Sequence, residues 1–245
     1  MNCRVFYIVL LYCIGTGPAS AVGWRYVEAP PTAPINAADF MIASDGALWS
    51  LGYDGARRTD TTGSTLPLAA QPDSFVPEFD RALPLADGGA ILVDDGLACG
   101  VTRTDRSLRR IWRETTAYPC VDVAASQTGR TWVADHANLY LFSDAGRRLL
   151  MFPFDDVAYT RVVRIGAAPD GGASIAATAG TSGDSVVRRF DRTGYIEWTW
   201  ANAPLEVERV VVDPAGFTYV VGFVRASNFT IGNLHVYKLQ AEGGG

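Results

Sequence analysis

Apolar residues occur along this chain in short runs separated by turns rich in glycine and aspartate. Short runs enriched in β-branched and aromatic residues and bounded by such turns predict β-strands. Five of the turns end in a glycine that is followed at once by an apolar run. These glycines are Gly46, Gly89, Gly129, Gly172 and Gly216.

The five glycines are almost evenly spaced, at intervals of 43, 40, 43 and 44 residues. A period of about 40–45 residues is the length of one four-stranded blade of a β-propeller. The spacing therefore predicts an all-β fold, a β-propeller of about five four-stranded blades. A larger propeller of roughly six to eight blades, to which this chain contributes only a part, stays open as the alternative.

The third and fourth repeats show the pattern most clearly, whereas the first repeat is the least regular. In the third repeat the predicted strands cover 121–125, 131–134, 139–142 and 149–152. In the fourth they cover 161–165, 173–177, 186–190 and 195–200, and we expect 108–112 to be the outer strand of the second repeat. No helix is needed in this arrangement.

The fifth repeat ends after its third predicted strand, at 236–239, and lacks an outer strand. Residues 23–29 have the spacing of that missing strand. Gly23 precedes Gly46 by 23 residues, and the outer-strand segment at Gly194 precedes Gly216 by 22. We therefore expect residues 23–29 to complete the last blade and to close the ring, which would leave no long unpaired edge.

The N-terminus has the pattern of a secretory signal peptide: Arg4, an apolar run over 5–14 and the small residues 19–21. We predict a signal peptide at 1–21 and a single propeller domain at 22–245. The apolar run is too short to span a bilayer, which needs about 20 residues. An extracytoplasmic protein without a transmembrane segment is predicted, periplasmic or secreted. A lipid anchor on Cys13 is not favoured, because Tyr12 precedes it.

The chain is acidic, with 21 lysine and arginine against 26 aspartate and glutamate residues and a net charge of −5. Removal of Arg4 with the signal peptide would make the net charge about −6. Non-specific nucleic-acid binding depends on clustered positive charge, so no nucleic-acid partner is expected.

Two of the four cysteines, Cys3 and Cys13, would leave with the signal peptide. In an oxidising compartment the remaining pair predicts a disulfide between Cys99 and Cys120. Blade topology supports the pairing, because Cys99 follows the turn between the second and third strands of one blade and Cys120 precedes the first strand of the next. The alternative is a reactive thiol or a metal ligand.

No residue pattern indicates a catalytic, cofactor or metal site. The chain has two histidines, too few alone for a central lyase or lactonase cluster, and its acidic pairs lack the alternating spacing of a calcium loop. Turn chemistry explains the Asp-Gly sites equally well. Asp135 is a candidate for a central pocket with Arg103 or Arg188. The histidines are His136 and His235, and the acidic pairs are Asp94-Asp95 and Asp155-Asp156. Three tryptophans are interpreted as packing residues of the blades: Trp49, Trp132 and Trp198.

Residues 210–222, Asn228-Phe229 and 235–239 resemble the bacterial β-propeller repeat of the SBBP type. Residues 129–135 and 138–142 are similar to the NHL-type repeat, and 191–194 followed by Trp198 is similar to the repeat of quinoprotein-like propellers. The resemblance implies a propeller fold and agrees with a secreted or cell-envelope location. It carries over no catalytic residue, since the matched positions are turns and core strands.

The favoured function is that of a non-enzymatic propeller that binds a protein, peptide or glycan, because a rigid scaffold presents its loops at a small ordering cost. The alternative is an extracytoplasmic hydrolase or lyase with a metal or acid centre in the axial channel. A cluster of acids in that channel would favour the enzyme, and an apolar channel would count against it. A chain that functions only beside a neighbouring domain is the third possibility.

Overall fold

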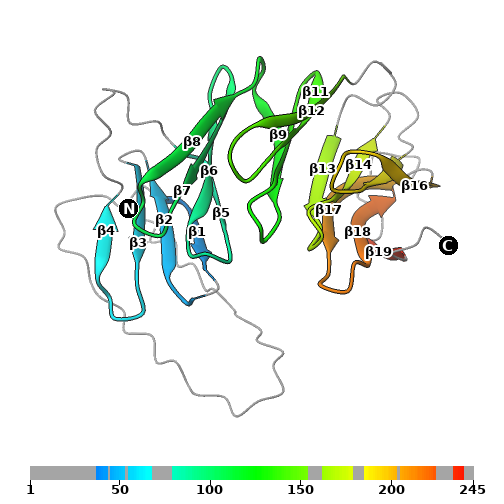
Figure 1. Ribbon diagram of the computed structural model, residues 1–245. Helices are drawn as coiled ribbons and strands as arrows, with labels where there is room; N and C mark the ends of the chain where they lie inside the picture. Colours follow the sequence, from blue (N-terminus) through cyan, green and yellow to red (C-terminus); the bar gives the residue numbers. More distant parts are fainter. Residues whose placement is uncertain are drawn as a thin grey trace, which may run out of the picture. The chain divides into compact units, whose positions relative to one another are not determined.

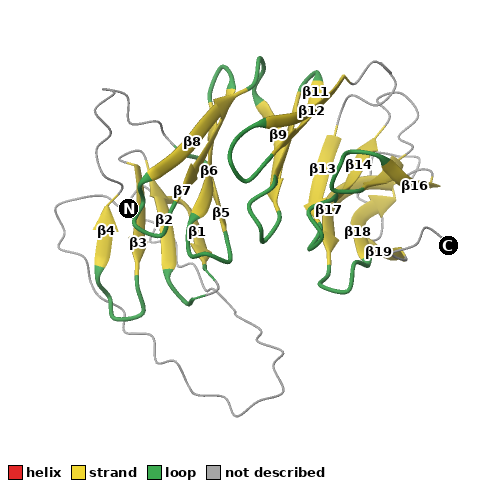
Figure 2. Ribbon diagram, viewed as in Figure 1, coloured by secondary structure: helices red, strands yellow, loops and turns green. Residues whose placement is uncertain are grey.

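The computed structural model describes residues 37–43, 45–52, 55–67, 79–153, 162–178, 185–202, 205–224 and 234–239. The chain divides into residues 1–34 and 35–245, and every described residue belongs to the second unit. The described residues form strands and turns without a helix, so the all-β prediction is confirmed (Figure 2). Within them, no helical segment is long and apolar enough to cross a bilayer.

The strands form five antiparallel sheets that follow one another along the chain (Figure 1). Sheet 1 holds β1 (Ala37–Ile42), β2 (Leu48–Gly52), β3 (Gly55–Thr59) and β4 (Thr65–Pro67). Sheet 2 holds β5 (Arg81–Pro84), β6 (Ala90–Asp95), β7 (Cys99–Thr104) and β8 (Arg110–Thr115). Sheet 3 holds β9 (Cys120–Ala125), β10 (Thr131–Asp135), β11 (Asn138–Phe142) and β12 (Arg148–Pro153). Sheet 4 holds β13 (Val162–Ala167), β14 (Ala173–Thr178), β15 (Ser185–Phe190) and β16 (Ile196–Asn202), and sheet 5 holds β17 (Leu205–Val212), β18 (Thr218–Val224) and β19 (Leu234–Leu239).

Each sheet is an up-and-down meander, in which every strand pairs with the next strand in the chain. The hydrophobic core lies between neighbouring sheets. One buried cluster joins sheets 1 and 2, a second joins sheets 2 and 3, and two more follow between sheets 3 and 4 and between sheets 4 and 5. The predicted packing role of Trp49 and Trp132 is confirmed, since both side chains are fully buried.

The turn before each second strand differs from the prediction in sheets 2 and 4. The glycine with positive φ is Gly88 and not Gly89, and Gly171 and not Gly172. The second glycine of each pair meets a different demand. A Cβ on Gly89 would lie 2.2 Å from the Thr104 carbonyl oxygen, so close backbone approach excludes a side chain there.

The predicted outer strand at 108–112 begins too early, because Leu108 lies in the turn before β8. Its φ of 63° is left-handed, whereas the corresponding turns of sheets 3 and 4 place Gly146 and Gly194 in that conformation. This backbone costs a non-glycine residue about 1–2 kcal/mol. The Leu108 side chain is fully buried in the core between sheets 1 and 2, and that burial offsets the cost.

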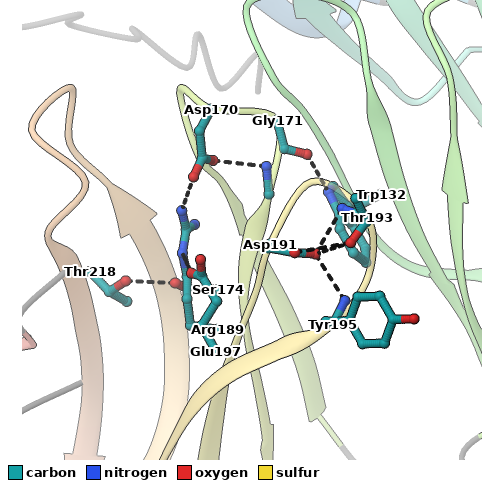
Figure 3. Close-up of polar contacts among 11 residues, drawn as sticks. Trp132, Asp170, Gly171, Ser174, Arg189, Asp191, Thr193, Tyr195, Glu197 and Thr218 are labelled. Carbon is teal, nitrogen blue, oxygen red and sulfur yellow. Dashed lines mark hydrogen bonds and ion pairs between the residues drawn. The ribbon is translucent and has the colours of Figure 1, made fainter. Parts of the chain in front are cut away.

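An aspartate and an arginine join the first turn to the third strand in three of the sheets. Asp45 pairs with Arg58, Asp87 with Arg103 at 2.8 Å, and Asp170 with Arg189 at 2.8 Å. Each of these aspartates also accepts a backbone N–H two residues later, which closes the turn. Figure 3 shows the Asp170–Arg189 contact together with Glu197, which bonds the same arginine. Turn chemistry therefore explains these acidic residues.

We expect Asp87→Asn to lower the free energy of unfolding by about 1 kcal/mol at pH 7, because the side chain is half exposed. Burial alone would raise the pKa of Asp87, but the Gly89 N–H and the Arg103 guanidinium outweigh burial and lower it. The ionised carboxylate thus stabilises the fold above the unfolded pKa of about 3.9. That contribution is lost as the pH falls through the folded pKa, so the difference between variant and wild type should narrow below about pH 4. Urea denaturation of variant and wild type at several pH values measures this difference in the free energy of unfolding.

Asp94→Asn is the matched control. Burial raises the pKa of Asp94, Arg113 lowers it, and Asp80 and Asp95 raise it, so the net shift is upward. The charged form of Asp94 therefore disfavours folding at neutral pH, and the stability of Asp94→Asn relative to wild type should improve as the pH rises. Equal pH slopes for the two variants would contradict both assignments.

Sheet 5 has three described strands, and β19 lies at its edge. Leu234 and Val236 on β19 are 58% and 61% exposed, whereas the third strands of sheets 2 and 3 are almost completely buried. The predicted signal peptide at 1–21 and the predicted closing strand at 23–29 lie outside the described residues. Closure by residues 23–29 therefore stays a proposal, and the exposed side chains of β19 support it.

Candidate functional site

The first strands of four consecutive sheets line one cavity of about 930 Å3. Its wall consists of residues 80–83, 121–125, 164–167 and 208–212, together with Asp95. We call it the first-strand cavity. Among the described strands, each of β5, β9, β13 and β17 pairs on one side only, so the backbone groups on its other side that no side chain holds can meet a ligand.

Each of these strands buries one residue of its wall segment between the sheets, and the residue before it points to the opposite face. Ala82, Val123, Ile165 and Val210 are buried among the sheets. The residue before each of them is charged and lies at least partly exposed in the cavity wall. These charged residues are Arg81, Asp122, Arg164 and Arg209.

The four charged residues stand at the same offset, seven positions before the positive-φ glycines Gly88, Gly129, Gly171 and Gly216. The sequence analysis missed this set because it considered histidines, acidic pairs and known motifs. The signal in the sequence that could have found these four residues was their common offset from the turn glycines. A repeated structural position that carries a charge in every sheet places those charges at one level of the cavity.

Three of these residues connect one sheet to the next. Arg81 forms an ion pair with Asp122 at 2.8 Å, which joins sheet 2 to sheet 3. The second carboxylate oxygen of Asp122 accepts the Ile165 N–H at 2.8 Å, which joins sheet 3 to sheet 4. Arg164 donates from Nε to the Glu208 carbonyl oxygen at 3.0 Å, which joins sheet 4 to sheet 5. The cavity wall is thus fixed by contacts between sheets.

Gly166 allows the first strands of sheets 4 and 5 to approach closely. A Cβ at this position would lie 2.9 Å from the Val210 carbonyl oxygen and 3.0 Å from its Cγ1. Any larger residue would push β13 away from β17. The glycine therefore helps to hold Arg164 and Arg209 on adjacent positions of the wall.

The three aspartates of the wall are engaged by backbone donors or by arginine, as Asp122 already shows. The Asp95 N–H donates to Asp80 at 2.7 Å, and a carboxylate oxygen of Asp95 accepts the Cys120 N–H at 2.9 Å. Asp94, next to the wall, pairs with Arg113 at 3.2 Å. Over the described part of the chain, no three histidine, cysteine or acidic side chains gather as a metal-binding group.

Cys99 and Cys120 form a disulfide, with their Cα atoms 4.6 Å apart. The bridge joins the start of β7 in sheet 2 to the start of β9 in sheet 3. Both cysteines are buried in the core between these sheets.

The structure does not bring Asp135 into the cavity with Arg103 or Arg188, so that prediction is wrong. The buried Asp135 carboxylate accepts the N–H groups of Ala137 and Asn138 and the Tyr140 hydroxyl, and so it stabilises its own hairpin. Burial raises the pKa of Tyr140, and Asp135 raises it further. Arg103 instead pairs with Asp87 in its own sheet.

The two histidines lie apart from the cavity. His136 is exposed in the turn between β10 and β11. His235 lies on β19 and stacks on Tyr237 with the ring centroids 6.0 Å apart. Asp155 and Asp156 lie outside the described residues.

The chain resembles several solved structures in fold. It superposes on a Kuenenia stuttgartiensis hydrazine synthase chain with a TM-score of 0.61 at 12% identity, and on the Neurospora crassa Pan2 WD40 domain with 0.54 at 17%. A streptogramin B lyase structure gives 0.54 at 14%. The fold is a β-propeller. The alignments cover 88%, 86% and 82% of this chain, but only about two thirds of each solved chain, 66%, 66% and 68%.

At these identities the likeness shows the fold alone. No family model and no curated protein matches the chain. The propeller expected from the repeat spacing is therefore confirmed, while the SBBP-type and NHL-type assignments stay predictions. Function has to be argued from the first-strand cavity, since propellers host unrelated activities.

Proposed function

We propose that this chain is a non-enzymatic, extracytoplasmic propeller that binds a protein, peptide or glycan segment in the first-strand cavity. The carrying observation is that four sheets each place a charged residue at the same offset in a wall already fixed by contacts between the sheets. A preformed polar wall binds a ligand without first paying the entropy of ordering its own groups.

The state of the acids supports binding over hydrolysis or elimination. A general acid or base needs a carboxyl group free to exchange a proton with the substrate. Asp122 instead holds a guanidinium and a backbone N–H, and Asp95 holds the Cys120 N–H. These two carboxylates of the described wall therefore have a structural use.

The Cys99–Cys120 disulfide supports an oxidising compartment, as does the signal-peptide pattern over residues 1–21. The printed titles of the structural neighbours include WD40 and Dos1 propellers and streptogramin B lyases. An enzyme related in chemistry to the lyases is thus the competing function that the experiment must distinguish.

The test is affinity selection by native mass spectrometry of the full chain against a mixed library of peptides and oligosaccharides. We expect a ligand that binds one to one and is recovered chemically unchanged after long incubation. Recovery of converted ligand would favour the enzyme and contradict the proposal.

Two tryptophan variants locate the binding site. Val211, 52% exposed, lies in the cavity wall, whereas Val236, 61% exposed, lies on β19 outside the described wall. We expect Val211→Trp to fill the cavity and abolish binding of the selected ligand, and Val236→Trp to leave it unchanged. Binding unaffected by Val211→Trp would show that the first-strand cavity is not the site.

A further inference from the structure

We propose that Arg164 and Arg209 bind carboxylate groups of an acidic peptide in the first-strand cavity. This inference rests on the proposed function and names its ligand class. Its starting point is an asymmetry among three arginines at the same offset in their sheets. Arg81 is neutralised by Asp122, whereas Arg164 and Arg209 form no ion pair within the described residues.

Arg164 is oriented without being neutralised. Its Nε donates to the Glu208 carbonyl oxygen at 3.0 Å and its Nη1 donates to the Val163 carbonyl oxygen at 3.2 Å. Both acceptors are neutral, so the guanidinium keeps its full charge while two of its donors are fixed in direction. The remaining donors can face a ligand with little loss of side-chain entropy.

Arg209 lies on the neighbouring strand and is exposed. Its backbone pairs with β18, but its side chain forms no hydrogen bond or ion pair with any residue that the structure describes. Arg164 bonds the carbonyl group of Glu208, the residue directly before Arg209, so the two arginines occupy adjacent positions on the wall. Two arginines at adjacent positions of one wall favour planar oxyanions, which accept paired N–H donors from a guanidinium fork.

Glu208 opposes this site. Its carboxylate lies in the same wall, but it is not within ion-pair distance of either arginine in the described structure. Glu208 therefore reduces the positive potential without closing the site. This arrangement predicts that removal of the Glu208 charge strengthens binding of an anion.

The wall favours a peptide as the carrier of the carboxylates. β13 and β17 lie at the edges of their described sheets, and the edge backbone groups that Asp122 and Arg164 do not hold can bond a peptide backbone. No aromatic side chain lies in the described wall, so it offers no stacking platform for sugar rings. The small and apolar residues Ala124 and Val211 lie two positions after Asp122 and Arg209 and add little bulk to the wall.

The test is calorimetric titration of the full chain with four probes: tetraglutamate, tetraglutamine, tetragalacturonate and inorganic phosphate. We expect saturable binding of tetraglutamate, weakened by added salt because the site is partly exposed. Arg164→Gln and Arg209→Gln should each weaken it about tenfold, which corresponds to about 1.4 kcal/mol. Glu208→Gln should strengthen tetraglutamate binding about two- to fivefold, which corresponds to about 0.5–1 kcal/mol.

Arg147→Gln is the matched control, because Arg147 is an exposed arginine in the last turn of sheet 3 and outside the cavity wall. Its affinity should equal that of wild type. The proposal is overturned if the Arg164 and Arg209 variants bind like the control, if tetraglutamine binds equally well, or if only tetragalacturonate or phosphate binds. Absence of saturable tetraglutamate binding up to about 10 mM also overturns it.

The proposed binding site and the proposed ligand class can fail separately. If a library ligand is lost on Val211→Trp but tetraglutamate does not bind, the cavity is the site and the ligand class is wrong. If no library ligand responds to Val211→Trp, the proposed function itself is wrong.

Discussion

Trp132→Ala is expected to lower the free energy of unfolding by about 3–5 kcal/mol, the cost of removing a fully buried large aromatic side chain. Trp132 packs between sheets 3 and 4, with its ring centroid 5.6 Å from that of Phe190. Its Nε1 donates to the Gly171 carbonyl oxygen at 3.2 Å, in the turn of the next sheet (Figure 3). The variant thus loses packing and a contact between sheets together. Urea denaturation followed by tryptophan fluorescence and circular dichroism measures the change.

Trp49 provides a matched control for the hydrogen bond. It lies three residues after Gly46, as Trp132 lies three residues after Gly129, and it is also fully buried. Its Nε1 has no hydrogen-bond partner in the described structure. Trp132→Phe should therefore cost more than Trp49→Phe, by about 1 kcal/mol. If Trp132→Ala cost less than about 1 kcal/mol, sheets 3 and 4 would not be packed as described.

Loss of the Cys99–Cys120 disulfide is expected to lower the free energy of unfolding by about 3 kcal/mol, the value for a closed loop of this size. The two cysteines are 21 residues apart in the sequence. The bridge ties sheet 2 to sheet 3 where both strands begin, so its removal frees the unfolded chain more than it disturbs the folded core. For a protein of this length the midpoint of thermal unfolding should fall by roughly 10 °C.

Thermal unfolding of wild type and of the double variant Cys99→Ser/Cys120→Ser, each with and without reductant, measures this contribution. Reductant should lower the wild-type midpoint to that of the double variant and leave the double variant unchanged. A wild-type midpoint that does not move, although alkylation shows that the thiols are free, would contradict a stabilising role for the bridge.

The repeat spacing identified the fold because each sheet needs the same left-handed turn at the same place. In three sheets the glycine with positive φ is the one that the repeat spacing identified: Gly46, Gly129 and Gly216. In the paired glycines the sequence could not separate the two demands of positive φ at Gly88 and close backbone approach at Gly89, because both select glycine. Leu108 was misplaced for the opposite reason, since burial between sheets outweighed the backbone preference that the sequence analysis relied on.

The cavity was harder to predict than the fold. Its charged residues come from four repeats, and each alone has the pattern of an ordinary strand residue. Only the common offset of Arg81, Asp122, Arg164 and Arg209 joins them, and their pairing depends on contacts between sheets. Asp135 failed as a candidate because its position at a strand end cannot distinguish a pocket residue from one that closes its own hairpin.

Amide hydrogen exchange of the full chain, with and without tetraglutamate, tests most directly whether the first-strand cavity is the binding site. Free N–H groups on the edge strands exchange readily until a ligand covers them. We expect slower exchange in the four wall segments only, strongest at residues 164–167 and 208–212 and weaker at 80–83 and 121–125. Protection limited to β8, β12 or β16, or no change at saturating tetraglutamate, would contradict it.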